Sequence, residues 1–254
     1  DHGSLKPMAE AKRKAEAAGK HVHFGELMDL CFEKHSELDL KDRVYKGRVV
    51  FRGDQVRDES GFYAVFSEQG SSASRLEAAK FLDAIAHFHG CDGEDSDAVG
   101  AYTQVVLEEM QESDYVETWI RLPPSRRPAS WAKIEDPVCK LRLNLYGHPL
   151  AGLYWERFCE AAVTAAGFAR VRGWECLYVH RAKGLFLSIY VDDFKMAGRK
   201  DQLEPMWKLL RQKLDLEQPV KMHGNVYLGC VMNKHDPKPA EVQAKAEFVK
   251  GLLD

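Results

Sequence analysis

Close cysteine pairs are absent from this sequence. The six cysteines among the 254 residues lie far apart, and no two form a Cys-x-x-Cys pair. Disulfide frameworks and zinc modules rest on close cysteine spacing, so the pattern favours buried thiols in a reducing compartment. We therefore expect an intracellular protein, cytoplasmic or nuclear. Two His-x-His pairs, His21/His23 and His87/His89, have no further ligand at metal-binding spacing, which favours structural or surface roles.

Long hydrophobic runs are also missing. No window approaches the roughly eighteen uninterrupted apolar residues that a membrane span requires, so no membrane partner is expected. With 45% hydrophobic and 30% charged residues, the composition is typical of a globular protein that can bury a substantial core. The first residues, Asp1-His2-Gly3-Ser4, lack an initiator Met and a signal pattern, which favours a fragment of a longer chain.

The sequence lacks the basic excess that usually accompanies nucleic-acid binding. Its formal net charge is −3, whereas neutralising phosphates normally requires a surplus of Lys and Arg. Basic residues are nevertheless concentrated in one region, at Lys41, Arg43, Lys46, Arg48, Arg52 and Arg57. Any contact with nucleic acid is therefore expected to be local.

Hydrophobic periodicity predicts an α+β fold, a sheet with helices packed on one face. Residues 1–40 are predicted to be a helical extension that includes an amphipathic segment from Phe24 to about His35. Strands are predicted at 44–52 with a partner at 62–66, near Asp97, at 117–122, at 138–145, and in a hairpin at 175–180 and 185–191. Further helices are predicted from Ser72 or Ser74 to about His89, at 151–166, at 201–216, and from about 239.

Two adjacent aspartates, Asp192 and Asp193, interrupt the apolar run LFLSIYVDDFKMAG at the tip of a predicted hairpin. Charge is costly there unless a positive group lies beside it, and a divalent metal would meet that need. An ordinary hairpin turn, with Lys195 neutralising one carboxylate, is the alternative. Asp97 precedes a run of small residues, so a sheet that brings it beside the hairpin would complete a hard oxygen site suited to Mg²⁺.

Five blocks of the sequence, in their order and spacing, resemble those of copia-type retrotransposon reverse transcriptases. They span about residues 41–232, and the Tyr-Val-Asp-Asp block is the most specific. The blocks are Tyr45-Lys46-Gly47-Arg48-Val49-Val50, Asp97 with Ala101-Tyr102, Leu145-Tyr146-Gly147 with Trp155, Tyr190-Val191-Asp192-Asp193, and Tyr227-Leu228-Gly229.

The resemblance implies a right-hand polymerase architecture, with fingers and an antiparallel palm over residues 41–232. A C-terminal helix at 233–254 would then be the start of a truncated thumb. The implied activity is RNA-directed DNA synthesis within a retrotransposon polyprotein. Its partners would be an RNA or DNA template with primer, and a dNTP.

The resemblance also assigns roles to individual residues. Asp97, Asp192 and Asp193 match the catalytic aspartates, with Asp97 and Asp192 as principal ligands of two Mg²⁺ ions, for which Mn²⁺ could substitute. Residues that would contact the nucleotide are Lys46, Arg48 and Tyr102, the last as a filter against the ribose 2′-hydroxyl. Residues that would hold the primer end are Tyr227, Leu228 and Gly229. Ordinary core packing is the alternative for Tyr102 and for the last block.

Departures from the family pattern leave other functions open. Leu150 stands where the family often carries Gln, Gly152 replaces a frequent Pro, and the chain ends soon after the palm. A domesticated, catalytically weak or inactive relative, serving as a structural or interaction subunit with protein partners, is therefore the second hypothesis. An unrelated metal-dependent phosphotransferase is the third, and it explains the carboxylates but not the other blocks.

Overall fold

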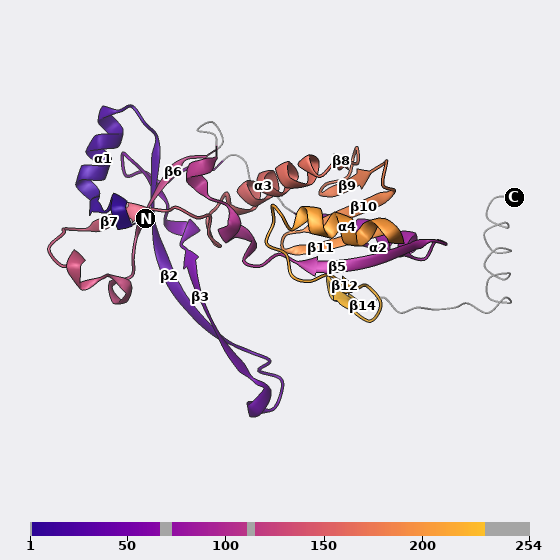
Figure 1. Cartoon of the computed structure of the whole chain (residues 1–254). Helices are drawn as coiled ribbons and strands as arrows, with labels where there is room; N and C mark the ends of the chain where they lie inside the picture. The colour runs from indigo at the N-terminus through magenta and orange to yellow at the C-terminus, as the bar shows by residue number, and fades with distance from the viewer. Residues whose placement is uncertain (1, 67–72, 111–114, 232–254) are drawn as a thin grey trace, which may run out of the picture.

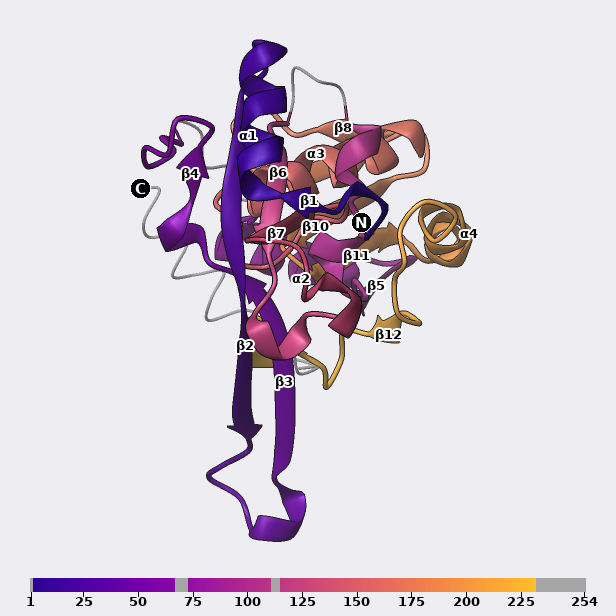
Figure 2. The same ribbon diagram turned by 90° about the vertical axis from the view of Figure 1, so that its left-hand side faces the viewer.

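Four α-helices and two large sheets make up the part of the chain that the computed structural model describes, residues 2–66, 73–110 and 115–231 (Figures 1 and 2). The helices are α1 (Met8–Ala17), α2 (Leu76–Ala86), α3 (Ala151–Ala165) and α4 (Lys200–Leu210). The predicted C-terminal helix, 233–254, lies outside the described residues. No described helix has the length and apolar character that crossing a membrane would take.

The first sheet is built mainly from the N-terminal third of the chain. In spatial order its strands are β1 (Lys6–Pro7), β7 (Pro137–Lys140), β6 (Glu117–Arg121), β2 (Val22–Lys34) and β3 (Val44–Phe51), with β4 (Arg57–Asp58) also paired to β2. The β2–β6 pairing is parallel and the others are antiparallel. Helix α1 packs Ala11 and Ala15 against Val22, Phe24 and Trp119 of this sheet.

The outer part of β2 and all of β3 form a two-stranded ribbon that projects from the molecule (Figure 2). The strand predicted at 44–52 is confirmed, but the helix predicted from Phe24 to His35 is wrong, because these residues form most of β2. Met28, Leu30 and Phe32 alternate with Asp29, Cys31 and Glu33, and this period of two fits the pleat of a strand. Over so short a segment the apolar positions fit a helical stripe as well, and pairing with β3 decides the structure.

The second sheet is antiparallel throughout and is built from the C-terminal half of the chain together with β5. In spatial order its strands are β12 (Val220–Lys221), β5 (Cys91–Asp97), β11 (Asp193–Arg199), β10 (Leu185–Tyr190), β9 (Leu177–His180) and β8 (Ala169–Arg170). A separate small hairpin, β13 (Val226–Tyr227) and β14 (Cys230–Val231), follows β12. The strand predicted near Asp97 and the hairpin predicted at 175–180 and 185–191 are confirmed.

Helices cover both faces of the second sheet, so the expectation that they pack on one face is wrong. On one face, Phe194 and Met196 of β11 join a core cluster with residues of α3 and α4, such as Trp155 and Trp207. On the other face, Ala197 of β11 packs in a cluster with Ala78, Leu82 and Ala86 of α2. Strand residues alternate between faces, and the apolar character of successive β11 residues buries both.

Two local predictions also differ from the structure. Residues 62–66 do not pair with β3; Tyr63 instead forms an isolated bridge with Arg57, and the Ala64 amide donates to the Val56 carbonyl oxygen. Helix α2 begins after Arg75, with no side-chain cap, and the Ser74 hydroxyl instead accepts a hydrogen bond from Ser188 of β10 at 2.7 Å. Ser72, the other predicted cap, lies outside the described residues.

Candidate active site

The tip of the β10–β11 hairpin is a two-residue turn. Tyr190 pairs with Asp193, and Val191 and Asp192 form the turn between them. Val191 has a φ of 56°, a left-handed conformation that is strained for a β-branched residue. Trp155 Nε1 of α3 donates a hydrogen bond to the Val191 carbonyl oxygen at 2.5 Å. The turn leaves Asp192 exposed and Asp193 half-buried, so the adjacent aspartates are presented differently.

Strand β5 brings the third aspartate to the same place. Asp97, the last residue of β5, is the register partner of Asp193. The Ala98 amide donates to the Asp192 carbonyl oxygen at 2.7 Å, which ties the strand end to the turn. The sheet therefore places Asp97, Asp192 and Asp193 next to one another along the backbone at this end of the sheet.

Negative charge accumulates at this end of the sheet. Burial, together with the nearby Asp192 and Asp97 carboxylates, raises the pKa of Asp193 to about 6. The pKa of Asp97 is also raised, first by desolvation and then by Glu217 and Asp192. Among the described residues, no basic side chain forms an ion pair with any of the three aspartates. The site therefore concentrates negative charge that a cation would relieve.

Lys195 does not neutralise the aspartate pair, which removes the alternative of a simple charge-balanced turn. Its ammonium group lies on the α2 side of the sheet, 2.6 Å from Asp83 Oδ1 and 3.7 Å from Asp95 Oδ1.

The donor chemistry of the three aspartates fits Mg²⁺, because carboxylate oxygens are the hard ligands that this ion prefers. The side chains do not converge as the ligands of one ion would: over the residues that the structure describes, no group of three His, Cys, Asp or Glu side chains has such an arrangement. Asp97 and Asp192 are both exposed. The three residues therefore provide carboxylate ligands of the right kind, but their side chains are not already arranged around a single metal position.

An aromatic and cationic row runs from the β2–β3 ribbon to the aspartates. The Arg48 guanidinium lies 5.3 Å from the Phe32 ring centroid and 5.8 Å from that of Tyr146. The Tyr146 ring in turn lies 4.4 Å from the Tyr102 ring, centroid to centroid. Burial raises the pKa of Tyr146, and the Asp192 carboxylate raises it further, so this row ends beside the aspartates.

Two of the predicted nucleotide contacts, Arg48 and Tyr102, are therefore joined through Tyr146. Lys46 is exposed on the same face of β3, one step farther along the ribbon, and the structure does not bring it to the aspartates. Sequence reasoning gave no role to Tyr146 itself or to Phe32. The alternation of apolar and polar residues along β2 is the signal that could have placed Phe32 on a strand face. In the structure Phe32 is the register partner of Lys46.

The block predicted to hold the primer lies against the back of the β10–β11 hairpin. Tyr227 is buried, and its hydroxyl donates toward the Asp193 carbonyl oxygen at 3.5 Å. Leu228 and Gly229 form the turn of the β13–β14 hairpin, with φ values of 48° and 76°. Of this block, the Leu228–Gly229 turn is the accessible part.

Glu217 is a site residue that sequence reasoning missed. Its amide donates to the Asp97 carbonyl oxygen at 2.8 Å, and its carboxylate contributes to the raised pKa of Asp97. Leu150 occupies the N-cap position of α3 and packs against the main core, so it offers no polar contact there.

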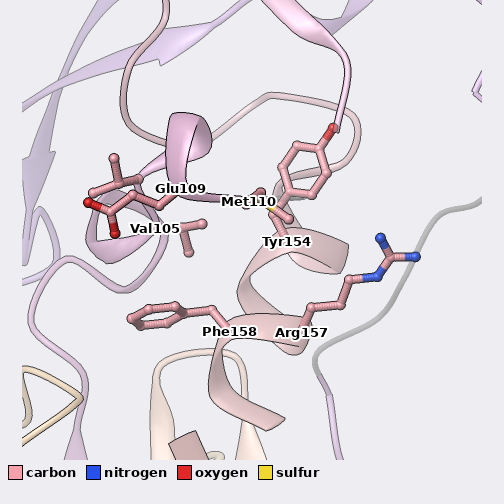
Figure 3. A pocket seen from close by; sticks show the side chains of 7 residues that line it. Val105, Glu109, Met110, Tyr154, Arg157 and Phe158 are labelled. Carbon is pink, nitrogen blue, oxygen red and sulfur yellow. The ribbon is translucent and has the colours of Figure 1, made fainter. Parts of the chain in front are cut away.

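A cavity of about 320 Å³ lies apart from this site, between α3 and residues 105–110 (Figure 3). Its lining includes none of the residues predicted for catalysis or for binding. The residues that line it are Val105, Val106, Glu109, Met110, Tyr154, Arg157 and Phe158.

Adjacent carboxylates are the ligands with which metal-dependent phosphoryl-transfer enzymes commonly hold Mg²⁺. The chain belongs to the reverse transcriptase (RNA-dependent DNA polymerase) family, whose model matches residues 29–238. This family is the copia/Ty1 type of reverse transcriptase, so the resemblance drawn from the sequence is confirmed. No curated protein gives a significant match to the chain.

Proposed function

We propose that this chain is the RNA-directed DNA polymerase domain of a retrotransposon polyprotein, which adds deoxynucleotides to a primer 3′-hydroxyl. The observation that carries the proposal is the register pairing of Asp97 with Asp193 beside the exposed Asp192 turn. In this proposal the second sheet is the palm, and the first sheet with its projecting ribbon is the fingers.

Asp97 and Asp192 would hold Mg²⁺, and the half-buried Asp193 would add negative charge behind them. Bound Mg²⁺ would supply activation of the 3′-hydroxyl and neutralisation of the pyrophosphate leaving group. Arg48 and Lys46 would bind the triphosphate by charge-assisted hydrogen bonds. Tyr102, whose ring packs on Tyr146, would lie under the sugar of the incoming nucleotide.

The test is incorporation of dTTP on an oligo(dT)-primed poly(rA) template, with Mg²⁺ and with Mn²⁺. Activity should require the metal and should fall by at least about a thousandfold in Asp192→Asn, because transition-state charge would lose its stabilisation. Asp201→Asn is the matched control, since Asp201 is an exposed aspartate at the start of α4. Full activity in Asp192→Asn would overturn the proposed site.

One observation favours the second candidate, a catalytically weak relative that serves as an interaction subunit. Leu150, at the start of α3, packs against the core where the family often carries Gln. A wild-type chain that is folded and binds primer–template, yet incorporates no nucleotide with either metal, would support this candidate. Restored incorporation in Leu150→Gln would then identify the lost contact.

A further inference from the structure

Lys195 is a buried lysine that the proposed chemistry does not use. It lies on β11, two residues after Asp193, and is 2% exposed. Its Nζ atom is 2.6 Å from Asp83 Oδ1 of α2 and 3.7 Å from Asp95 Oδ1 of β5. One ammonium group therefore joins α2, β11 and β5 behind the catalytic hairpin.

The same lysine also contacts the β13–β14 hairpin. Its Nζ atom lies 4.6 Å from the centroid of the Tyr227 ring, a cation–π contact in a buried setting. The Tyr227 hydroxyl reaches the Asp193 carbonyl oxygen. Lys195 thus lies over the Tyr227 ring, while the backbone of Asp193 accepts from the hydroxyl of the same side chain.

Asp95 makes a second contact with the segment that leads into the β13–β14 hairpin. Its Oδ2 atom accepts a hydrogen bond from Asn225 Nδ2 at 3.0 Å, one residue before β13. Its Oδ1 atom accepts no hydrogen bond within the described residues, so Lys195 is the charge that compensates this buried carboxylate. Removing the lysine alone would leave a buried charge without a counterion.

Stability does not explain why these charges are buried. A buried ion pair is commonly matched or surpassed in stability by well-packed apolar residues of similar volume, so another role is expected for it here. Here the groups joined are the strand that carries Asp193, the strand that carries Asp97, and the hairpin that carries Leu228 and Gly229.

We propose that Lys195 is a positioning residue that, with Asp95, fixes the β13–β14 hairpin against the back of the Val191–Asp192 turn and thereby sets the place of the primer terminus. This inference rests on the proposed polymerase function. It assigns to Lys195 an effect on primer–template use and none on the capture of the nucleotide, whose predicted contacts lie on the other side of the site.

The first test is steady-state kinetics of Lys195→Met combined with Asp95→Asn, which removes both members of the buried pair. We expect an about tenfold higher KM for primer–template with the KM for dTTP unchanged, the split that a positioning role produces. Lys195→Arg, which keeps the charge, should recover most of the primer–template affinity. Lys221→Met is the matched control, because Lys221 is an exposed lysine of β12 paired with Asp92 and Glu94.

The second test is amide hydrogen exchange of residues 222–231, which needs no catalytic activity. Exchange there should be faster in the double variant than in the wild type, including at the Asn225 amide, which donates to the Met222 carbonyl oxygen. Should the double variant fail to fold, Asn225→Ala offers the same test at a half-buried position, since it removes only the contact with Asp95.

The outcomes separate this inference from the proposed function. An active wild type whose variants keep the wild-type KM for primer–template would overturn the inference and leave the polymerase assignment intact. An inactive wild type would count against the polymerase assignment, and the exchange rates would then decide whether Lys195 positions the hairpin. Unchanged exchange at 222–231 in a folded variant overturns the inference in either case.

Discussion

Trp155 Nε1 donates a hydrogen bond to the carbonyl oxygen of Val191, at 2.5 Å. This bond connects a fully buried residue of α3 to the tip of the β10–β11 hairpin, where Val191 adopts a left-handed backbone conformation. A conformation of that kind costs on the order of 1–3 kcal/mol and persists only where its surroundings hold it. The α3 indole therefore helps to maintain the turn that exposes Asp192.

We expect Trp155→Phe to lower nucleotide incorporation by about tenfold or more, because the turn loses its anchor and Asp192 loses its fixed position. Losing the hydrogen bond should also cost about 1–3 kcal/mol of stability, measured by denaturant unfolding. Trp207→Phe is the matched control, because Trp207 is equally buried and its Nε1 finds no acceptor among the described residues. Equal losses of activity in both variants would show that ring volume, and not the hydrogen bond, matters.

Gly147 lies between the aromatic row and the end of β3. We expect Gly147→Ala to lower the free energy of unfolding of the protein. The residue has a φ of 88°, and an added Cβ would collide with the Phe51 carbonyl oxygen. Strain and collision together should cost at least about 2 kcal/mol, as judged from urea unfolding. Gly47→Ala serves as the comparison, since a Cβ at Gly47 meets nothing within 4 Å. Similar unfolding midpoints for the two variants would contradict this account.

Tyr102 is predicted to exclude ribonucleotides, so Tyr102→Val should raise incorporation of rUTP relative to dTTP by about ten- to a hundredfold. The ring packs against Tyr146, which limits its movement away from a bulkier sugar. Tyr102→Phe keeps the ring and should retain the discrimination. Both ratios of kcat/KM can be measured on one primer–template. If the valine variant discriminates as well as the wild type, Tyr102 is a packing residue.

The strands that carry the aspartates could be predicted from the sequence because their signals are local. An apolar run broken by Asp192 and Asp193 indicates a hairpin tip, and Asp97 ends a strand before a run of small residues. The sheet register then pairs Asp97 with Asp193. The order of these motifs along the chain also sufficed to identify the family.

Features that depend on contacts between distant residues could not be predicted. The spacing of apolar residues in β2 fits a helix as well as a strand, and only the pairing with β3 decides between the two. The two faces of β11 are distinguished only by which helices cover them. The link from Arg48 through Tyr146 to Tyr102 joins three segments far apart in the sequence. Nor does the sequence show that Lys195 turns away from the nearby aspartate pair toward Asp83 and Asp95.

His148 should make the protein less stable in acid. It is buried, its Nδ1 accepts a hydrogen bond from the Leu150 amide, and burial lowers the pKa of its imidazole to about 3. Below the ordinary histidine pKa of roughly 6.5 the unfolded chain therefore binds a proton that the folded chain does not. The stability that His148 contributes is present above that pH and is lost as the pH falls toward 3.

The expected loss from His148 is on the order of 2 kcal/mol between pH 7 and pH 5, from the difference between the two pKa values. The measurement is urea unfolding of the wild type and His148→Gln at pH 8 and at pH 5. At pH 8 the two proteins differ only by packing and hydrogen bonding, so the additional change at pH 5 isolates the titration. His23, whose pKa burial lowers to about 4, should leave part of the dependence in the variant. A variant that loses stability as steeply as the wild type would show that His148 is not kept neutral by the fold.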